Sequence, residues 1–271
     1  MPSSNPAFSR FGADGNGRQQ PAPWGAAPQQ YGAPTQYDPY SAPSPYAATT
    51  ARYMTMDDVV TKTGITFIVT VLAAAAIWAL PGSTGWGLAL PAVFAGFILA
   101  MVISFKAIAN PAATLAYAAL EGIALGAISE AFNSIPQFNG IVMQAVIGTF
   151  GVFAGMLVVY KTGAIRVTPK FTRWILGALV GVVVLMFANI IASFITPGGL
   201  GLRSGGTLAI VFSLVVIGVA AFSLLLDFDM ADEAIRRGAP PKFAWYIAFG
   251  LLVTVVWLYL EILRLLSYFR E

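Results

Sequence analysis

Long apolar runs, separated by short connections rich in glycine and proline, make up most of the sequence from Met54 onward. A helix that crosses a hydrocarbon core about 30 Å thick needs about 20 mainly apolar residues. Seven runs reach that length, at residues 64–81, 86–105, 111–129, 138–160, 173–195, 207–227 and 244–268. The pattern therefore predicts an all-α integral membrane domain with seven transmembrane helices over residues 54–271.

Local signals within this domain predict a helix start and close helix packing. Thr55 and Asp58 have the spacing of a capping box, with Asp in place of the preferred Glu or Gln, and predict a short lead-in helix before the first run. Pairs of small residues four positions apart let two helices approach closely. Two glycine pairs have this spacing, Gly122 with Gly126 and Gly177 with Gly181. We interpret both pairs as ordinary packing within a helix bundle.

Residues 1–53 differ in composition from the rest of the chain. The first 50 residues hold nine prolines and five glutamines, and no apolar run that could form a core. We expect this tail to be disordered. It lacks the cationic start and the apolar centre of a secretory signal. Two interpretations stay open: a solvated tether, or a docking tail whose tyrosines are accessible to a partner.

The composition excludes several kinds of chemistry. Hydrophobic residues make up 58% of the 271 positions and charged residues only 10%, and the sequence has neither cysteine nor histidine. Thiolate nucleophiles, Ser-His relays and metal sites built from these ligands are therefore excluded. We expect no enzymatic activity and no cofactor. A net charge of +3 gives no argument for binding nucleic acid.

The distribution of Lys and Arg predicts the orientation in the membrane. If the amino terminus is cytoplasmic, 12 of the 15 basic residues fall on the inner side. They are Arg10, Arg18, Arg52, Lys62, Lys106, Lys161, Arg166, Lys170, Arg173, Arg236, Arg237 and Lys242. Arg203, Arg264 and Arg270 fall outside. Because cytoplasmic connections are enriched in Lys and Arg, we expect a multi-pass protein of the cell (inner) membrane with its carboxy terminus outside.

Reporter fusions after Thr55 and at Glu271 test this orientation. We expect a cytoplasmic reporter to be active in the first fusion and an external reporter in the second. Activity of both fusions on one side of the membrane would contradict a seven-span topology.

Four acidic side chains lie in or beside the apolar runs. Because a charge at the bilayer centre costs at least about 2.5–3.5 kcal/mol, such acids are candidates for function. Glu121 lies about 15 Å into the third run, where it either bonds to a neighbouring helix or lines a polar path. Asp227 ends the sixth run after three leucines, and Asp229 follows it in an acidic rim. Glu261 lies deep in the seventh run, one turn before Arg264, so a Glu–Arg pair within the helix is its structural alternative.

Asp227 and Glu261 are the candidates for a proton-sensing and gating pair. Two carboxyls brought together in a low dielectric share a proton, and when both are ionised they can bind a hard cation such as Ca²⁺. We therefore predict a possible Ca²⁺ site at this pair, and an ion pathway that includes Glu121 and Asp229. Counted along straight helices, Glu261 lies about 25 Å into its run. Contact with Asp227 then requires the last helix to begin in the cytoplasm.

Motifs spread along the chain resemble one known family. They are Ser4–Arg10, Glu121-Gly-x-x-Leu-Gly126, Leu226-Asp227-Phe and Leu258-Tyr-Leu-Glu261-Ile-Leu. Together they resemble the Bax inhibitor/YccA family, in particular its bacterial branch with a proline-rich amino-terminal tail. The resemblance covers about residues 54–271, and in the tail Asn5-Pro6.

This resemblance implies both a fold and an activity. The last helix would run up the middle of the other six, and an acidic pair on the sixth and seventh helices would control a pH-sensitive Ca²⁺ leak. By motif, Asp227 and Glu261 take these two positions. The acid of the seventh helix is commonly Asp in the family, and the segment between the two acids is longer here.

We therefore expect a pH-sensitive leak channel for cations, with Ca²⁺ as the expected ion, gated by protonation of carboxylates within the membrane. A non-conducting interaction protein that modulates a membrane protease or a stress response is the alternative. An intramembrane aspartyl protease also needs paired acids, but the Gly-x-Gly-Asp signature of those enzymes is missing. Flux through the purified protein in liposomes separates a channel from an interaction protein.

Overall fold

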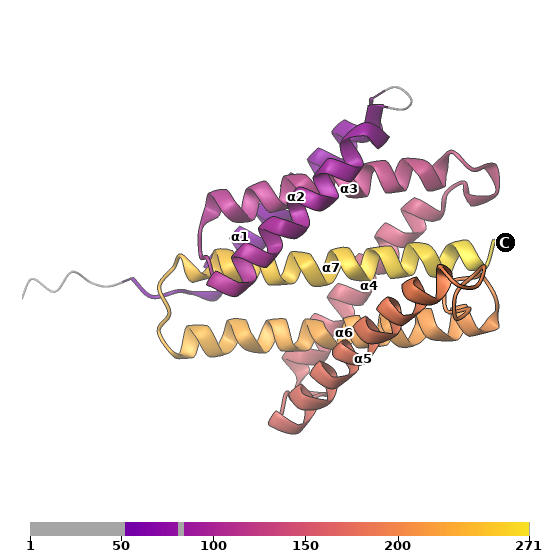
Figure 1. Ribbon diagram of the computed structural model, residues 1–271. Helices are drawn as coiled ribbons and strands as arrows, with labels where there is room; N and C mark the ends of the chain where they lie inside the picture. Colours follow the sequence, from indigo (N-terminus) through magenta and orange to yellow (C-terminus); the bar gives the residue numbers. More distant parts are fainter. Residues whose placement is uncertain (1–51, 81–83, 271) are drawn as a thin grey trace, which may run out of the picture. The chain divides into compact units, whose positions relative to one another are not determined.

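The computed structural model describes residues 52–80 and 84–270, without the side chains of residues 84–86. The predicted tail thus lies outside the described residues, except for Arg52 and Tyr53. Within the described ranges the chain forms seven long α-helices, one short 3₁₀ helix and no strand (Figure 1). They are α1 (Met56–Trp78), α2 (Thr84–Lys106), α3 (Pro111–Asn133), η1 (Pro136–Phe138), α4 (Ile141–Thr162), α5 (Pro169–Ser193), α6 (Thr207–Arg236) and α7 (Phe243–Tyr268). All seven α-helices are long and apolar enough to cross a membrane, which confirms the predicted fold class.

The predicted capping box starts α1. Thr55 Oγ1 accepts a hydrogen bond from Asp58 N at 3.3 Å, and Asp58 Oδ2 accepts one from Thr55 N at 3.2 Å. From this cap α1 runs without a break into the first apolar run, so the predicted lead-in is the first part of the spanning helix itself. One turn further on, Lys62 Nζ donates to Pro241 O at 2.5 Å, which ties α1 to the connection between α6 and α7.

α6 is longer than its apolar run. The sequence places the end of the span at Asp227, but the helix continues to Arg236. The added segment contains neither glycine nor proline, and it still buries Phe228, Ala231 and Ala234. The helix ends before Gly238, whose φ of 69° suits a residue without a side chain. Asp227 therefore lies nine residues inside the helix rather than at its end.

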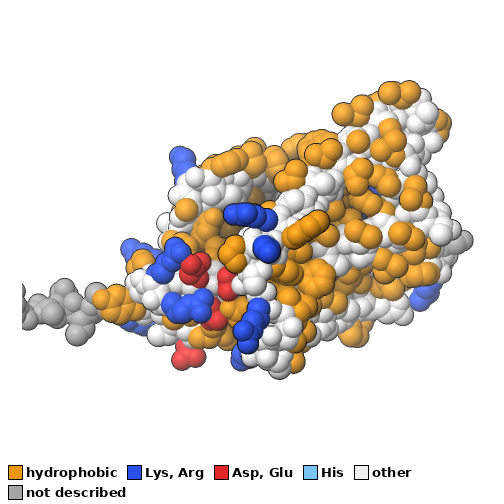
Figure 2. All heavy atoms as spheres, turned by 90° about the horizontal axis from the view of Figure 1, so that it is seen from below, with side chains coloured by type: hydrophobic (Ala, Val, Ile, Leu, Met, Phe, Trp, Pro, Cys, Tyr) orange, Lys and Arg blue, Asp and Glu red, His pale blue; other side chains and the backbone are white. Residues whose placement is uncertain are grey.

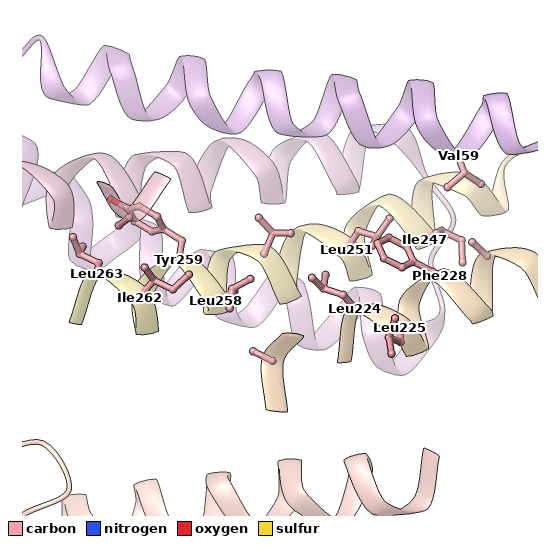
Figure 3. Packing of buried hydrophobic residues seen from close by; sticks show 14 of the residues in the cluster. Val59, Leu224, Leu225, Phe228, Ile247, Leu251, Leu258, Tyr259, Ile262 and Leu263 are labelled. Carbon is pink, nitrogen blue, oxygen red and sulfur yellow. The ribbon is translucent and has the colours of Figure 1, made fainter. Parts of the chain in front are cut away.

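α7 is the central helix of the bundle. In its membrane-length window 72% of the residues are buried, against 17–50% in the other six spans. It packs against α1, α3, α4 and α6, whereas α2 packs on α3 and α5 packs on α6. Figure 1 shows α7 running between α1 and α6, and Figure 3 shows its side chains in the main hydrophobic cluster. The prediction of a central last helix is confirmed.

One of the two predicted glycine pairs makes a close helix contact. A Cβ added at Gly126 of α3 would lie 2.6 Å from Ala74 O of α1, and one at Gly122 would clash with Thr70 O. The backbones of α1 and α3 can touch here because no side chain separates them. Gly177 and Gly181 of α5 have no neighbouring atom within 4 Å of such a Cβ. The packing interpretation is therefore wrong for that pair within the described chain.

The two pairs provide a matched test of this packing. We expect Gly126→Ala to destabilise the detergent-solubilised protein by about 1–3 kcal/mol, because the added methyl group forces α1 and α3 apart. Gly181→Ala should leave stability unchanged or raise it by up to about 1 kcal/mol, since the position faces open space and Ala favours a helix interior over Gly. Thermal unfolding of both variants is the measurement. Equal losses would contradict the close α1–α3 contact.

Candidate functional site

Asp227 faces the central helix without a positive partner. Its Oδ2 accepts a hydrogen bond of 2.7 Å from Thr254 Oγ1 of α7. Gly250, one turn earlier, leaves room for the carboxyl, because a Cβ there would lie 3.8 Å from Asp227 Oδ1. Among the described residues no Lys or Arg forms an ion pair with Asp227. Leu224 and Leu225, three and two residues before it, are fully buried. In the part of the chain that the structure describes, Thr254 is thus the hydrogen-bond donor to this carboxyl, and it carries no charge.

Glu261 has the opposite surroundings. It is 2% exposed, and its Oε1 accepts hydrogen bonds from Arg203 Nη2 at 3.0 Å and from Arg264 Nη1 at 3.2 Å. Arg264 lies on the same helix, as the structural alternative predicted, while Arg203 comes from the connection between α5 and α6. The other carboxylate oxygen, Oε2, is buried and has no hydrogen-bond partner among the described residues. The two arginines place positive charge beside this buried carboxyl.

The structure does not bring Asp227 and Glu261 together. Asp227 is level with Thr254, and Glu261 follows seven residues later on α7, a rise of about 10 Å along the helix. Carboxylate oxygens bind Ca²⁺ at about 2.3–2.6 Å, so these two acids cannot hold one ion in this arrangement. Within the part of the chain that the structure describes, no three acidic side chains gather as a metal site. The structure separates the two acids, and Ca²⁺ binding at either of them stays a prediction.

Glu121 and Asp229 lie in two further places. Glu121 of α3 faces α2, where a Cβ added at Gly96 would lie 3.6 Å from its Oε1. Asp229 lies in the wall of a cavity of about 740 Å³ between α1, α4 and α6. Asp232, one turn further along α6, lines the same cavity and accepts a hydrogen bond of 2.8 Å from Tyr160 of α4. The four predicted acids thus occupy separate positions.

The sequence did not reveal the hydrogen-bond partners of Asp227 and Glu261. Serine and threonine occur throughout the apolar runs, so nothing in the sequence marks Thr254 as the partner of Asp227. Arg203 lies 58 residues from Glu261 in a connection rich in glycine. Glu130 of α3, whose Oε2 is buried without a hydrogen-bond partner in the described chain, was also missed. Glu130 directly follows the third apolar run, at residues 111–129, and this position was the signal that could have found it.

These features define a multi-pass membrane protein with acids in its spanning helices. The family described as Bax inhibitor 1 like matches residues 5–271. The chain therefore belongs to the Bax inhibitor family. No curated protein matches the sequence. Membership of the bacterial branch stays a prediction.

Breaking the Glu261 cluster should destabilise the fold. Glu261→Gln leaves Arg203 and Arg264 without their carboxylate, and we expect a loss of about 3 kcal/mol. Arg264→Gln leaves the Arg203 contact in place and should cost about 1 kcal/mol. Denaturant unfolding in detergent measures both losses.

Glu233→Gln is the control for this cluster, because its ion pair with Arg237 is exposed on one helix face. Such a pair contributes about 0.5 kcal/mol or less. A loss for Glu261→Gln no larger than that for Glu233→Gln would show that the buried cluster adds nothing to stability.

Proposed function

We propose that this protein is a pH-sensitive leak channel for cations, with Ca²⁺ as the expected ion and Asp227 as the group that senses protons. The observation that supports this most is the position of Asp227 within α6, bonded to Thr254 of the central helix and without a Lys or Arg partner in the described chain. An acid within a membrane span is costly, so such acids are rare. They usually have a partner that offsets their charge, or they mark a functional site. Glu261 is neutralised by two arginines, whereas Asp227 is not.

The Asp227–Thr254 hydrogen bond can link the charge of Asp227 to the packing of α6 on α7. A hydroxyl donates a stronger hydrogen bond to an ionised carboxylate than to a neutral carboxyl. Protonation of Asp227 therefore weakens the α6–α7 contact at this level. Because α7 also packs against α1, α3 and α4, a small displacement of α7 changes several helix contacts together. A proton can in this way shift the balance between a closed and an open arrangement.

The acids of α6 suit the inner part of a cation path. Asp229 and Asp232 follow Asp227 toward the end of α6 that the Lys and Arg distribution assigns to the cytoplasm. Figure 2 shows most of the charged side chains on the face in view gathered toward one end, with hydrophobic side chains over much of the rest. Carboxylate oxygens are the ligands that Ca²⁺ prefers. In this proposal Glu261 ties α7 to the α5–α6 connection and does not sense protons.

Flux of Ca²⁺ into liposomes containing the full-length protein tests this function. The wild-type protein should conduct with a rate that depends on pH, and Asp227→Asn should conduct at a rate that no longer changes with pH. Thr254→Val keeps the side-chain volume but removes the hydroxyl donor. We expect it to move the midpoint of the pH profile to higher pH, because the hydrogen bond favours the charged carboxylate.

Glu121→Gln is the control for a generic acid within the membrane, since Glu121 lies beside Gly96 of α2. It should leave the pH midpoint unchanged, whatever its effect on the rate. Absence of flux in the wild-type protein would favour the interaction protein instead. Flux with an unaltered pH profile in Asp227→Asn would place the proton sensor elsewhere.

A further inference from the structure

A groove lies between α1 and α4 in the half of the bundle that holds the start of α1. Its volume is about 740 Å³. α1 and α4 form its two sides, while Phe228 of α6 and Leu251 of α7 form its floor. Figure 3 shows Val59, Phe228 and Leu251 near one another at one end of the main hydrophobic cluster. We call this cavity the α1–α4 groove.

Apolar side chains of α1 and α4 form one part of the lining of the α1–α4 groove. Met56, Val59 and Val60 line it from α1, and Phe153 and Leu157 line it from α4. Val60 is 64% exposed, so the edge of the groove is open beside α1. The ring of Phe67 packs edge to face against Phe153, with ring centroids 5.9 Å apart, where α1 and α4 approach each other. This part of the groove can therefore hold an apolar chain, and it ends at the contact between Phe67 and Phe153.

Charged side chains of both signs line the same groove. Lys161 at the end of α4 and Arg166 in the α4–α5 connection supply positive charge, and Asp229 and Asp232 of α6 supply negative charge. Among the described residues none of these four takes part in an ion pair. The segment 161–173 also carries Lys170 and Arg173 and has no acid. Four basic residues beside a membrane span attract phosphate groups of lipids.

The length of the groove matches one leaflet of a bilayer. Lys161 lies eight residues after Phe153 on α4, a rise of about 12 Å. Half of a hydrocarbon core is about 15 Å thick. An amphiphile with its charged group at Lys161 would thus reach the Phe67–Phe153 contact with its apolar chain.

From these observations we infer that the α1–α4 groove binds a phospholipid whose headgroup carries both a phosphate and a primary ammonium group. Lys161 and Arg166 bind the phosphate, Asp229 and Asp232 bind the ammonium group, and an acyl chain fills the groove as far as Phe67. An anionic headgroup without an amine leaves the two aspartates facing negative charge. A choline headgroup has no N–H to donate. The ethanolamine headgroup satisfies both pairs of side chains.

Native mass spectrometry of the delipidated full-length protein tests this inference. Phosphatidylethanolamine, phosphatidylcholine and phosphatidylglycerol with identical acyl chains are added in turn. We expect the ethanolamine lipid to bind about fivefold more tightly than either of the others, the size of one partly exposed ion pair. Equal or tighter binding of the glycerol lipid would show that the basic segment acts alone and would overturn the assignment.

Variants that remove one charge test the ammonium contact and the phosphate contact separately. Asp229→Asn should remove the preference for the ethanolamine lipid and leave binding of the glycerol lipid unchanged or stronger. Arg166→Gln should weaken binding of all three lipids, because each has a phosphate. If the preference for the ethanolamine lipid survives Asp229→Asn combined with Asp232→Asn, the ammonium contact is wrong.

Two tryptophan variants test the place of the acyl chain. Leu157→Trp fills the groove, whereas Val158→Trp, at a neighbouring position 61% exposed and outside the groove, does not. We expect Leu157→Trp to weaken binding of the ethanolamine lipid at least about fivefold and Val158→Trp to leave it unchanged. Equal binding by the two variants would contradict the inference.

Crosslinking of the wild-type protein keeps the test independent of how the variants fold. A phosphatidylethanolamine with a photoreactive acyl chain should label peptides that contain residues 56–67 and 153–167. Labelling confined to the outer face of α5 would overturn the site.

Discussion

The central position of α7, with 72% of its membrane-length window buried, determines how the other helices are held together. A polar group in apolar surroundings costs several kcal/mol unless a neighbour satisfies it, so each polar side chain of a central helix requires a partner. Three polar side chains of α7 find theirs on other parts of the chain. Tyr259 shares a hydrogen bond of 2.7 Å with Ser129 of α3. Thr254 donates to Asp227 of α6, and Glu261 accepts from Arg203 of the α5–α6 connection. The same contacts that satisfy α7 thus fix it against three other parts of the chain.

Asp227 and Glu261 differ in what compensates their charge, and this difference suggests different roles. Two arginines contact Glu261, and their positive charge offsets the charge of its carboxylate. Asp227 has a neutral hydroxyl donor and no positive partner in the described chain, so its charge is not fixed. The proposed function therefore needs one proton-sensing acid rather than a pair.

The fold followed closely from the sequence because a membrane span has a strong local signal. All seven apolar runs became helices, and the capping box at Thr55 formed. The end of α6 was misplaced, because polar residues after an apolar run do not stop a helix that lacks glycine and proline. Of two glycine pairs with identical spacing, one packs and one faces open space, since spacing does not reveal which face of a helix meets a neighbour.

The candidate site was predicted only in part. Acidic residues in apolar runs are visible in the sequence, and the Glu261–Arg264 contact follows from helical spacing. The contacts to Arg203 and Thr254 depend on how distant segments pack, which no local pattern encodes. The sixth helix continues past Asp227 and places this acid level with Thr254, seven residues before Glu261. The predicted pair therefore became two separate sites.

Infrared difference spectroscopy of the reconstituted protein tests whether Asp227 is the acid that takes up the proton. The absorption of a protonated carboxyl group, recorded against pH, reports which buried acid takes up a proton. The account predicts a pH-dependent carboxyl band that disappears in Asp227→Asn and persists in Glu261→Gln. A band that persists in Asp227→Asn, or disappears in Glu261→Gln, would contradict it.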